Sequence, residues 1–215
     1  IAIGLSKLPL LLKFLSVCPL VDLELEIALT KIRSCILSSI FEIPKDPRLL
    51  DFQQALALHC FTNEYIYTVG PDEIKALQRL ETAVKKNFSD GKQPSPQFLL
   101  SLASYKALKD YQGCDAIKIN KSIQEVFTRQ ISEPFEEKKL KLEIKKLEKI
   151  SNKISSKVRE QYEKNPYPRW VNLGLSLKPY SIARVVFEEN LRLTDPLITK
   201  VNSPQILVAG CGTGE

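Results

Sequence analysis

The chain has 215 residues, of which 44% are hydrophobic, and this apolar content is sufficient for a packed core in one large or two smaller domains. Lysine and arginine number 31 against 25 acidic residues, which gives a formal net charge of +6. With its apolar content, this is the composition of a globular protein. The five cysteines are odd in number, lie far apart and form no C-x-x-C pair, which argues against a disulfide framework or a zinc site and favours a reducing cytoplasm.

The first 41 residues are expected to form two helices. Residues 5–17 have a helical pattern, with Ser6 as candidate N-cap and Pro9 in the first turn. The apolar stretch from Leu8 to Val21 is too short and too interrupted by prolines to span a bilayer, and it lacks a signal-peptide cleavage site. We therefore expect no membrane association. Residues 22–41 carry apolar residues at steps of three and four, which predicts one buried face: Leu25, Leu29, Ile32, Ile36 and Ile40.

Start signals that contain proline divide the middle of the chain into further helices. Asp46-Pro47 supplies an N-cap followed by proline at the first helical position, and that helix is predicted to continue through the aromatic run from Phe61 to Tyr67. Residues 72–88 form the next helix, and Ser95-Pro96 begins a shorter one that runs to about Leu108. The residues expected to face inward in this region are Leu49, Phe52, Leu56, Cys60, Ile74, Leu77, Leu80, Val84 and Phe88.

The remaining pattern before residue 164 is also helical. A helix is predicted from about Ala116 to Ile131, with Ile119, Ile123 and Val126 inside, and the charged segment after Pro134 adds one or two helices. No strand pattern competes before residue 200, and the signature of the 34-residue tetratricopeptide repeat is absent. The predicted fold class is therefore mainly α, with residues 1–164 as a bundle or array of antiparallel helices.

Two features of the helical region have both a functional and a structural interpretation. His59, the only histidine, precedes Cys60, and a catalytic Cys/His pair is conceivable, but a histidine packed at a helix interface is the favoured interpretation. Residues 136–164 contain ten basic and six acidic residues, a net charge of +4, which fits either a solvated helix face or a basic surface around Lys138 to Lys157 that binds RNA or protein.

Residues 161–170, QYEKNPYPRW, end the helical region, because each proline pushes the residue before it into extended geometry and removes a backbone donor. Tyr162, Tyr167, Arg169 and Trp170 leave this segment together. They either fill the seam between two domains or form a lid on a pocket, with aromatic faces available to a sulfonium cation. After this segment, one amphipathic helix is expected around residues 181–191.

The last ten residues, ILVAGCGTGE, carry the pattern with the clearest chemical purpose. Four apolar residues run into alternating glycines, which reads as a buried strand entering a tight turn where a ligand approaches the backbone. The dinucleotide fingerprint G-x-G-x-x-G requires a third glycine at position 215, which is Glu215, so a nucleotide-dependent oxidoreductase is disfavoured. The spacing present is G-x-G-x-G, formed by Gly210, Gly212 and Gly214.

The segment from Ile206 to Gly214 resembles the first motif of class I S-adenosylmethionine-dependent methyltransferases, although Val208 stands where that family usually has an acidic residue. Residues 161–170 resemble the QYE-x-NPYPRW segment that precedes such a domain in bacterial proteins with a helical, often tetratricopeptide-containing, region. Residues 61–67 also look like that helical region. The resemblance implies S-adenosylmethionine as cofactor, no metal, and the following cofactor-binding residues: Ala209, Gly210, Cys211, Gly212, Thr213, Gly214, Tyr167 and Arg169.

The resemblance further implies that residues 165–215 hold the linker and the Rossmann-like start of a methyltransferase domain. Because that domain requires further strands and helices, we expect a fragment that is open at both ends, inactive alone, and unable to bind the cofactor without the remainder. No catalytic residue is assigned, and the methyl acceptor, whether protein, RNA or small molecule, is left open. The alternative is a helical module that binds protein or RNA and has no activity of its own.

Overall fold

The computed structural model describes residues 1–18, 20–44, 46–143, 152–164, 171 and 178–205. It divides the chain into two compact units, residues 1–155 and 156–215. The expected domain boundary at 164/165 stays a prediction, because residues 165–170 lie outside the described residues. The described part is mainly helical and contains no strand, which confirms the helical class, whereas the Rossmann-like start at residues 206–215 lies outside what is described.

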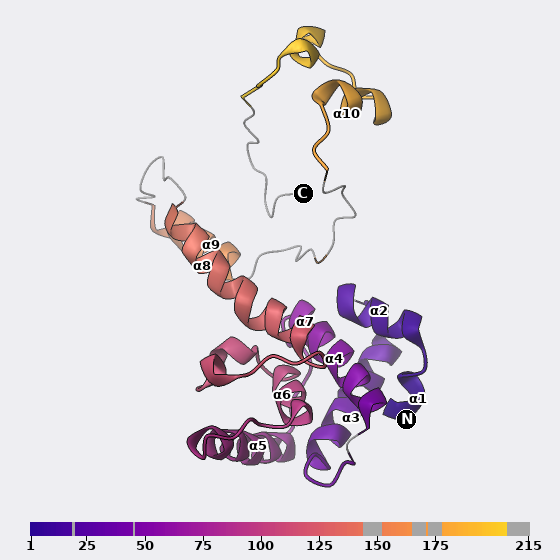
Figure 1. The fold of residues 1–215 in the computed structure, drawn as a ribbon, viewed down its shortest axis with the longest axis vertical. Coiled ribbons are helices and arrows are strands. Elements are labelled where there is room, and N and C mark those ends of the chain that lie inside the picture. Colours follow the sequence, from indigo (N-terminus) through magenta and orange to yellow (C-terminus); the bar gives the residue numbers. More distant parts are fainter. Residues whose placement is uncertain (19, 45, 144–151, 165–170, 172–177, 206–215) are drawn as a thin grey trace. The chain divides into compact units, whose positions relative to one another are not determined.

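The first unit is an array of helices, drawn from indigo to salmon in Figure 1. In chain order these are α1 (Ala2–Leu5), α2 (Pro9–Val17), α3 (Leu23–Ser38), α4 (Pro47–Thr62), α5 (Pro71–Ser89), α6 (Pro96–Ala103), α7 (Gln124–Phe127) and α8 (Glu133–Glu143). The 3-10 turns η1 (Leu108–Asp110) and η2 (Cys114–Ala116) follow α6, and a π-helical segment, η3 (Thr128–Ser132), joins α7 to α8.

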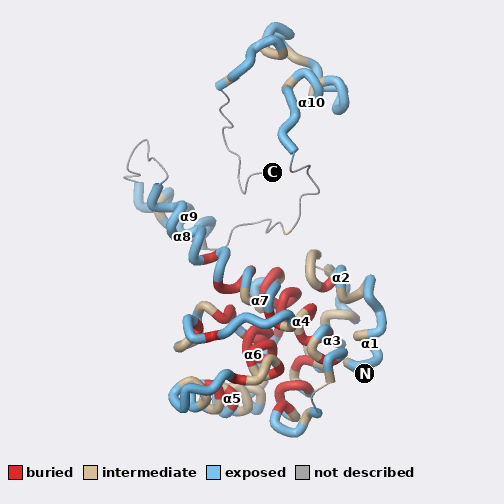
Figure 2. The backbone as a smooth tube through the Cα atoms, viewed as in Figure 1, coloured by how far each residue is buried: buried red, intermediate tan, exposed pale blue. Residues whose placement is uncertain are grey.

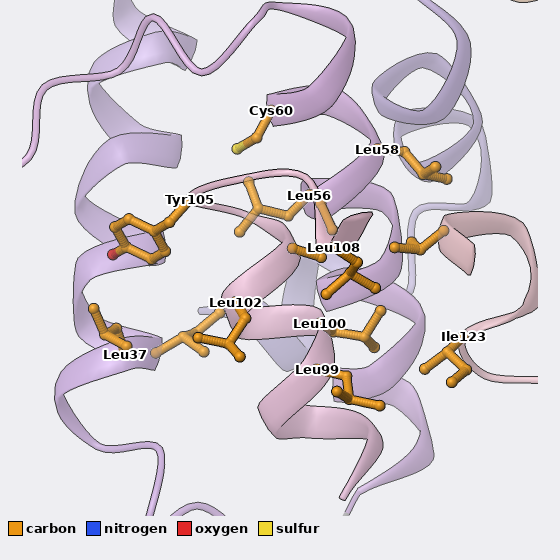
Figure 3. Close-up of a cluster of buried hydrophobic side chains, with 14 of the residues drawn as sticks. Leu37, Leu56, Leu58, Cys60, Leu99, Leu100, Leu102, Tyr105, Leu108 and Ile123 are labelled. Atoms are coloured by element: carbon orange, nitrogen blue, oxygen red, sulfur yellow. The ribbon is translucent and has the colours of Figure 1, made fainter. Parts of the chain in front are cut away.

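Helix α4 is the centre of this unit, since α2 packs on one side of it and α6 on another, while α3 and α5 pack against α6 and each other. Eleven residues of α4 are buried, so the helix is covered around most of its circumference. Figure 2 shows α4 and α6 largely buried and α5 largely exposed on its outer side. The close-up in Figure 3 shows Leu56 and Cys60 of α4 in the same buried cluster as Leu102 and Tyr105.

Helix starts follow the sequence signals in most cases. The Asp46 side chain accepts a hydrogen bond from the Arg48 N–H at 2.9 Å, and Ser95 accepts one from the Phe98 N–H at 3.3 Å, each followed by proline at the first helical position. Ser181 also caps α10, by accepting from the Arg184 N–H, but no proline follows it. The expected N-cap at Ser6 is wrong: Ser6 ends α1, and Pro9 begins a separate helix because it forces Leu8 out of the helical region.

Helices α4 and α6 end earlier than the sequence predicts. Helix α4 ends at Thr62 and does not continue to Tyr67, because Glu64 and Tyr65 adopt left-handed φ values of 54° and 57° that reverse the chain. Helix α6 ends at Ala103, five residues before the predicted Leu108. Each early end releases the chain so that a later tyrosine reaches a buried arginine, as described below.

The predicted helix from Ala116 to Ile131 is also wrong over its first half. The Gln93 side chain bonds the Ala116 carbonyl and the Lys118 N–H, both at 2.8 Å, and this holds the segment in a non-helical conformation against the preceding loop. Ile119, expected inside, is 55% exposed, whereas Ile123 and Val126 are fully buried as predicted. Helix begins only at Gln124.

The second unit contains the later part of α9 (Lys153–Lys164), then α10 (Ile182–Glu188) and the 3-10 turn η4 (Pro196–Lys200), which contacts α10. Helix α10 corresponds to the amphipathic helix expected around residues 181–191. Its Arg184 forms an ion pair with Glu188 at 2.7 Å, one turn later, which is a helix-supporting spacing.

Candidate functional site

The cofactor-binding residues predicted from the sequence fall outside the described part of the chain. These are Tyr167 and Arg169 in the proline-rich segment and the glycine loop from Ala209 to Gly214. Their roles therefore stay predictions. Tyr162, from the same motif, is described: it lies on α9 and is 66% exposed, so its ring is available for a contact.

A buried arginine organises the interior of the first unit. Arg33 of α3 is 2% exposed, and its Nη2 donates to the Thr68 carbonyl at 2.9 Å and lies 3.9 Å from a Glu73 carboxylate oxygen. Its guanidinium lies 4.2 Å from the centre of the Tyr105 ring and 5.5 Å from that of Tyr67. We call Arg33, Glu73, Tyr67 and Tyr105 the arginine cluster.

Glu73 completes the arginine cluster from α5. One of its carboxylate oxygens accepts from the Tyr105 hydroxyl at 2.6 Å, and the other accepts from the Gly70 N–H at the start of α5 at 2.9 Å. The carboxylate therefore caps its own helix and anchors the chain after α6 at the same time. The cluster ties α3, α5 and the segments after α4 and α6 to one buried charge.

The electrostatics of the arginine cluster indicate a structural role and no reactive one. Burial raises the pKa of Tyr67 to about 12, and burial followed by the hydrogen bond to Glu73 raises the pKa of Tyr105 further. Burial also raises the pKa of the neighbouring Cys60 thiol to about 12. All three groups stay protonated at neutral pH, so none is a nucleophile or a base there.

The histidine next to Cys60 is equally unsuited to catalysis. His59 is 1% exposed, and burial lowers its pKa, an effect that is opposed by hydrogen bonding of the imidazole to the backbone of Cys18 and Leu15. Its Nε2 lies 3.0 Å from the Asn63 side-chain nitrogen. An activated Cys/His pair requires a lowered thiol pKa beside a charged imidazole, and both groups here are shifted the opposite way. These shifts support the structural interpretation of His59.

A second set of buried polar contacts, which no sequence pattern indicated, lies at the π-helical segment η3. Arg129 donates to the Ser16 carbonyl at 2.6 Å and to the Thr62 hydroxyl at 2.9 Å. Gln130 donates to the carbonyls of Ala57 and Ala103 and accepts from the Leu108 N–H at 3.1 Å. These bonds fasten α2, α4 and α6 to one short segment.

The open surface feature of the first unit is a groove along the outer face of α5. It is open to solvent, has a volume of about 540 Å³ and is lined by Phe41, Lys75, Gln78, Arg79, Thr82, Ala83 and Lys86. We call this set the α5 groove. Every lining residue except Phe41 comes from α5, where the spacings of three and four place them on one face. All three charged lining residues are cations.

The basic segment that the sequence analysis singled out is described only in part. On α8, Lys139 forms an exposed ion pair with Glu136 at 3.7 Å, and Lys138 lies over the Phe135 ring at 5.5 Å. Residues 144–151 lie outside the described chain, so the basic surface around Lys138 to Lys157 stays a prediction. The α5 groove is a different surface, which the excess charge of residues 136–164 did not point to.

Comparisons of the chain with protein-family models, with curated proteins and with solved structures gave no match. Within the described residues, no three or more of the side chains that commonly bind metals are grouped to hold an ion. None of the helices over these residues is long and apolar enough to cross a membrane.

Proposed function

We propose that this chain belongs to an S-adenosylmethionine-dependent methyltransferase of the cytoplasm, to which it contributes a helical region and the first cofactor loop. The observation that carries the proposal is the spacing of Gly210, Gly212 and Gly214 directly after an apolar run. The order of the segments adds support, because the QYEKNPYPRW motif precedes this loop as it does in the family that the chain resembles.

The types of residue in the loop fit a cofactor of this kind. Glycines at alternate positions leave the backbone open to close approach by a ligand, and the N–H groups of such a turn bind polar groups. Residues 209–214 would hold the methionine part of the cofactor, while the Tyr167 ring and Arg169 would border the pocket. The cofactor supplies an activated methyl group, and the chain supplies orientation and exclusion of water, with proximity lowering such a barrier by roughly 7–11 kcal/mol.

The helical region is assigned to support and recognition, and not to chemistry. Its potential nucleophile Cys60 and its only histidine are both buried, and their pKa shifts hold each in the unreactive neutral form. Its exposed features include the α5 groove, which is open to solvent. We therefore place recognition of the methyl acceptor, or of a partner protein, on this region.

The second candidate is an interaction module without activity of its own. The α5 groove favours it, because a cationic concave face is built entirely on one well-packed helix and the Phe41 ring. The two functions are compatible, since a methyltransferase can carry such a module.

A methyl-transfer assay on the full-length gene product tests the proposal. We expect transfer of label from methyl-labelled S-adenosylmethionine to protein or RNA of a cell extract, and loss of this transfer in Gly212→Val, whose side chain would occupy the space of the ligand. Arg169→Ala should weaken transfer, and Cys211→Ser, which keeps a small polar side chain in the loop, should retain it. Label transfer that Gly212→Val leaves unchanged would contradict the assigned loop.

A further inference from the structure

The α5 groove has the charge and the geometry of a site for an acidic ligand. Lys75, Arg79 and Lys86 follow one another at steps of four and seven residues, so their Cα atoms are about 6 and about 10 Å apart along the helix axis. The polar side chains of Gln78 and Thr82 lie between them. The net result is a row of three cations with hydrogen-bonding groups in between.

The acidic residues of α5 do not neutralise this row. Glu73 points inward to the arginine cluster, and Glu81 lines the opposite side of the helix, in an apolar crevice. Asp72 forms an exposed ion pair with Lys75 at 3.4 Å, at one end of the groove only. Within the described chain, Arg79 and Lys86 form no ion pair.

Arg79 is held in position for a planar anion. Its guanidinium lies 5.6 Å from the centre of the Phe41 ring, and this ring in turn meets Phe98 of α6 edge to face, with centres 5.4 Å apart. A guanidinium that is held by an aromatic ring loses less side-chain freedom on binding, and its fork of N–H donors matches a carboxylate with two parallel bonds.

We propose that the α5 groove binds an acidic peptide segment of a partner protein, whose carboxylates face Lys75, Arg79 and Lys86. Glutamates on one face of a helix, four and seven residues apart, reproduce the spacing of the three cations. The proposal goes beyond the methyltransferase function and does not depend on it.

Single-stranded RNA is the less suitable ligand for this groove. Proteins that bind it combine cations with several aromatic rings on which successive bases stack. Phe41 is the only aromatic residue that lines the α5 groove, Arg79 lies over its face, and Phe98 contacts it edge to face. The groove thus offers charge and hydrogen bonds without a free stacking surface.

Fluorescence anisotropy with a labelled helical peptide tests the proposal. The probe is an alanine-rich peptide of 18 residues with glutamates at positions that reproduce the four- and seven-residue steps. We expect Arg79→Glu and Lys86→Glu each to weaken its Kd about tenfold or more, with binding that weakens as salt rises. Lys85→Glu is the matched control, because it makes the same charge change on the same helix outside the groove, and it should alter the Kd less than about twofold.

Two further probes complete the test. A peptide of the same composition with its glutamates spread around the helix should bind at least about fivefold more weakly than the first. A labelled oligouridylate should bind more weakly still, with no dependence on Arg79. Circular dichroism should show that the variants fold, and Arg79→Gln replaces Arg79→Glu if charge reversal disturbs α5. Equal losses in Lys85→Glu and Arg79→Glu, or RNA binding that Arg79 controls without peptide binding, would overturn the proposal.

Discussion

Replacing Arg33 is the change that most directly probes how the helical unit is held together. Arg33→Met keeps much of the side-chain volume but removes the charge and the donors to the Thr68 carbonyl at 2.9 Å. It also leaves the Glu73 carboxylate, whose side chain is 11% exposed, without its cation. Removing one partner of a buried ion pair costs about 3–5 kcal/mol, since the other charge stays buried and uncompensated.

The expected loss is large relative to the stability of a domain this size. The net free energy of unfolding of such domains is about 5–15 kcal/mol, so a loss of about 3–5 kcal/mol removes a third or more of it in most of that range. Glu73→Gln should cost about 1–2 kcal/mol, because the amide oxygen can still accept from the Gly70 N–H while the amide NH2 donates to the Tyr105 hydroxyl. The double variant should cost less than the sum of the two single variants, since the two residues interact.

Urea unfolding followed by far-UV circular dichroism measures these differences. Arg48→Met is the matched control: Arg48 also forms an ion pair, with Asp46 at 2.8 Å, but its side chain is 58% exposed. Such a surface pair contributes little to stability, because solvent screens its charges. If Arg33→Met and Arg48→Met lowered the free energy of unfolding equally, the arginine cluster would not be what holds α3 and α5 together.

Three further predictions concern pH and backbone geometry. Burial lowers the pKa of His59, so its stabilising contribution is present above pH 6.5 and is lost as the pH falls below that value. The free energy of unfolding in urea should therefore fall from pH 7 to pH 5.5, with a slope of at most about 1.4 kcal/mol per pH unit. His59→Gln should reduce this slope. Burial raises the pKa of Tyr67 from 10 to about 12, so its contribution to stability is complete below pH 10 and is lost as the pH rises through 12. Tyr67→Phe should make the free energy of unfolding depend less steeply on pH in that interval. An unchanged pH profile would contradict the assignment. Gly113 has a φ of 90°, and a Cβ there would lie 3.0 Å from the Phe88 ring, so Gly113→Ala should cost about 2–3 kcal/mol in thermal unfolding; Gly91→Ala, at a φ of 67° with open space around it, should cost only about 1 kcal/mol.

Helix starts were predictable from the sequence because they are encoded locally. Asp46, Ser95 and Ser181 each accept a hydrogen bond from a backbone N–H two or three residues later, and no distant residue is required. Helix ends were not predictable in the same way. Helix α4 stops at Thr62 and α6 at Ala103 where the chain turns toward the arginine cluster, and those contacts are made with residues of other helices.

Local periodicity also could not reveal the buried contacts of η3. Arg129, Gln130 and Ile131 are consecutive and all buried, which a helix with 3.6 residues per turn does not permit on one face. These residues lie in the π-helical segment, where Pro134 is tolerated because a proline lacks the N–H that would bond the Gln130 carbonyl in a regular helix. The sequence signal that could have indicated this segment is Pro134, four residues after Gln130.

The candidate binding surface was hidden for a related reason. The cations of α5 share the helix with Glu73 and Glu81, so the average charge of residues 71–89 is small. Only the assignment of faces separates the cations from the acids, and that assignment requires knowing where Glu73 finds its partners. The glycine loop is the reverse: its spacing can be recognised from the sequence alone, but its residues lie outside the described structure.

Titration calorimetry of S-adenosylmethionine into the full-length gene product tests the central claim most directly. The account predicts saturable binding of one cofactor per chain, loss of that binding in Gly212→Val with an unchanged melting temperature, and no binding of NADH. Absence of S-adenosylmethionine binding by the folded full-length protein, or binding that Gly212→Val leaves intact, would contradict the assignment of residues 206–214 as a methyltransferase cofactor loop.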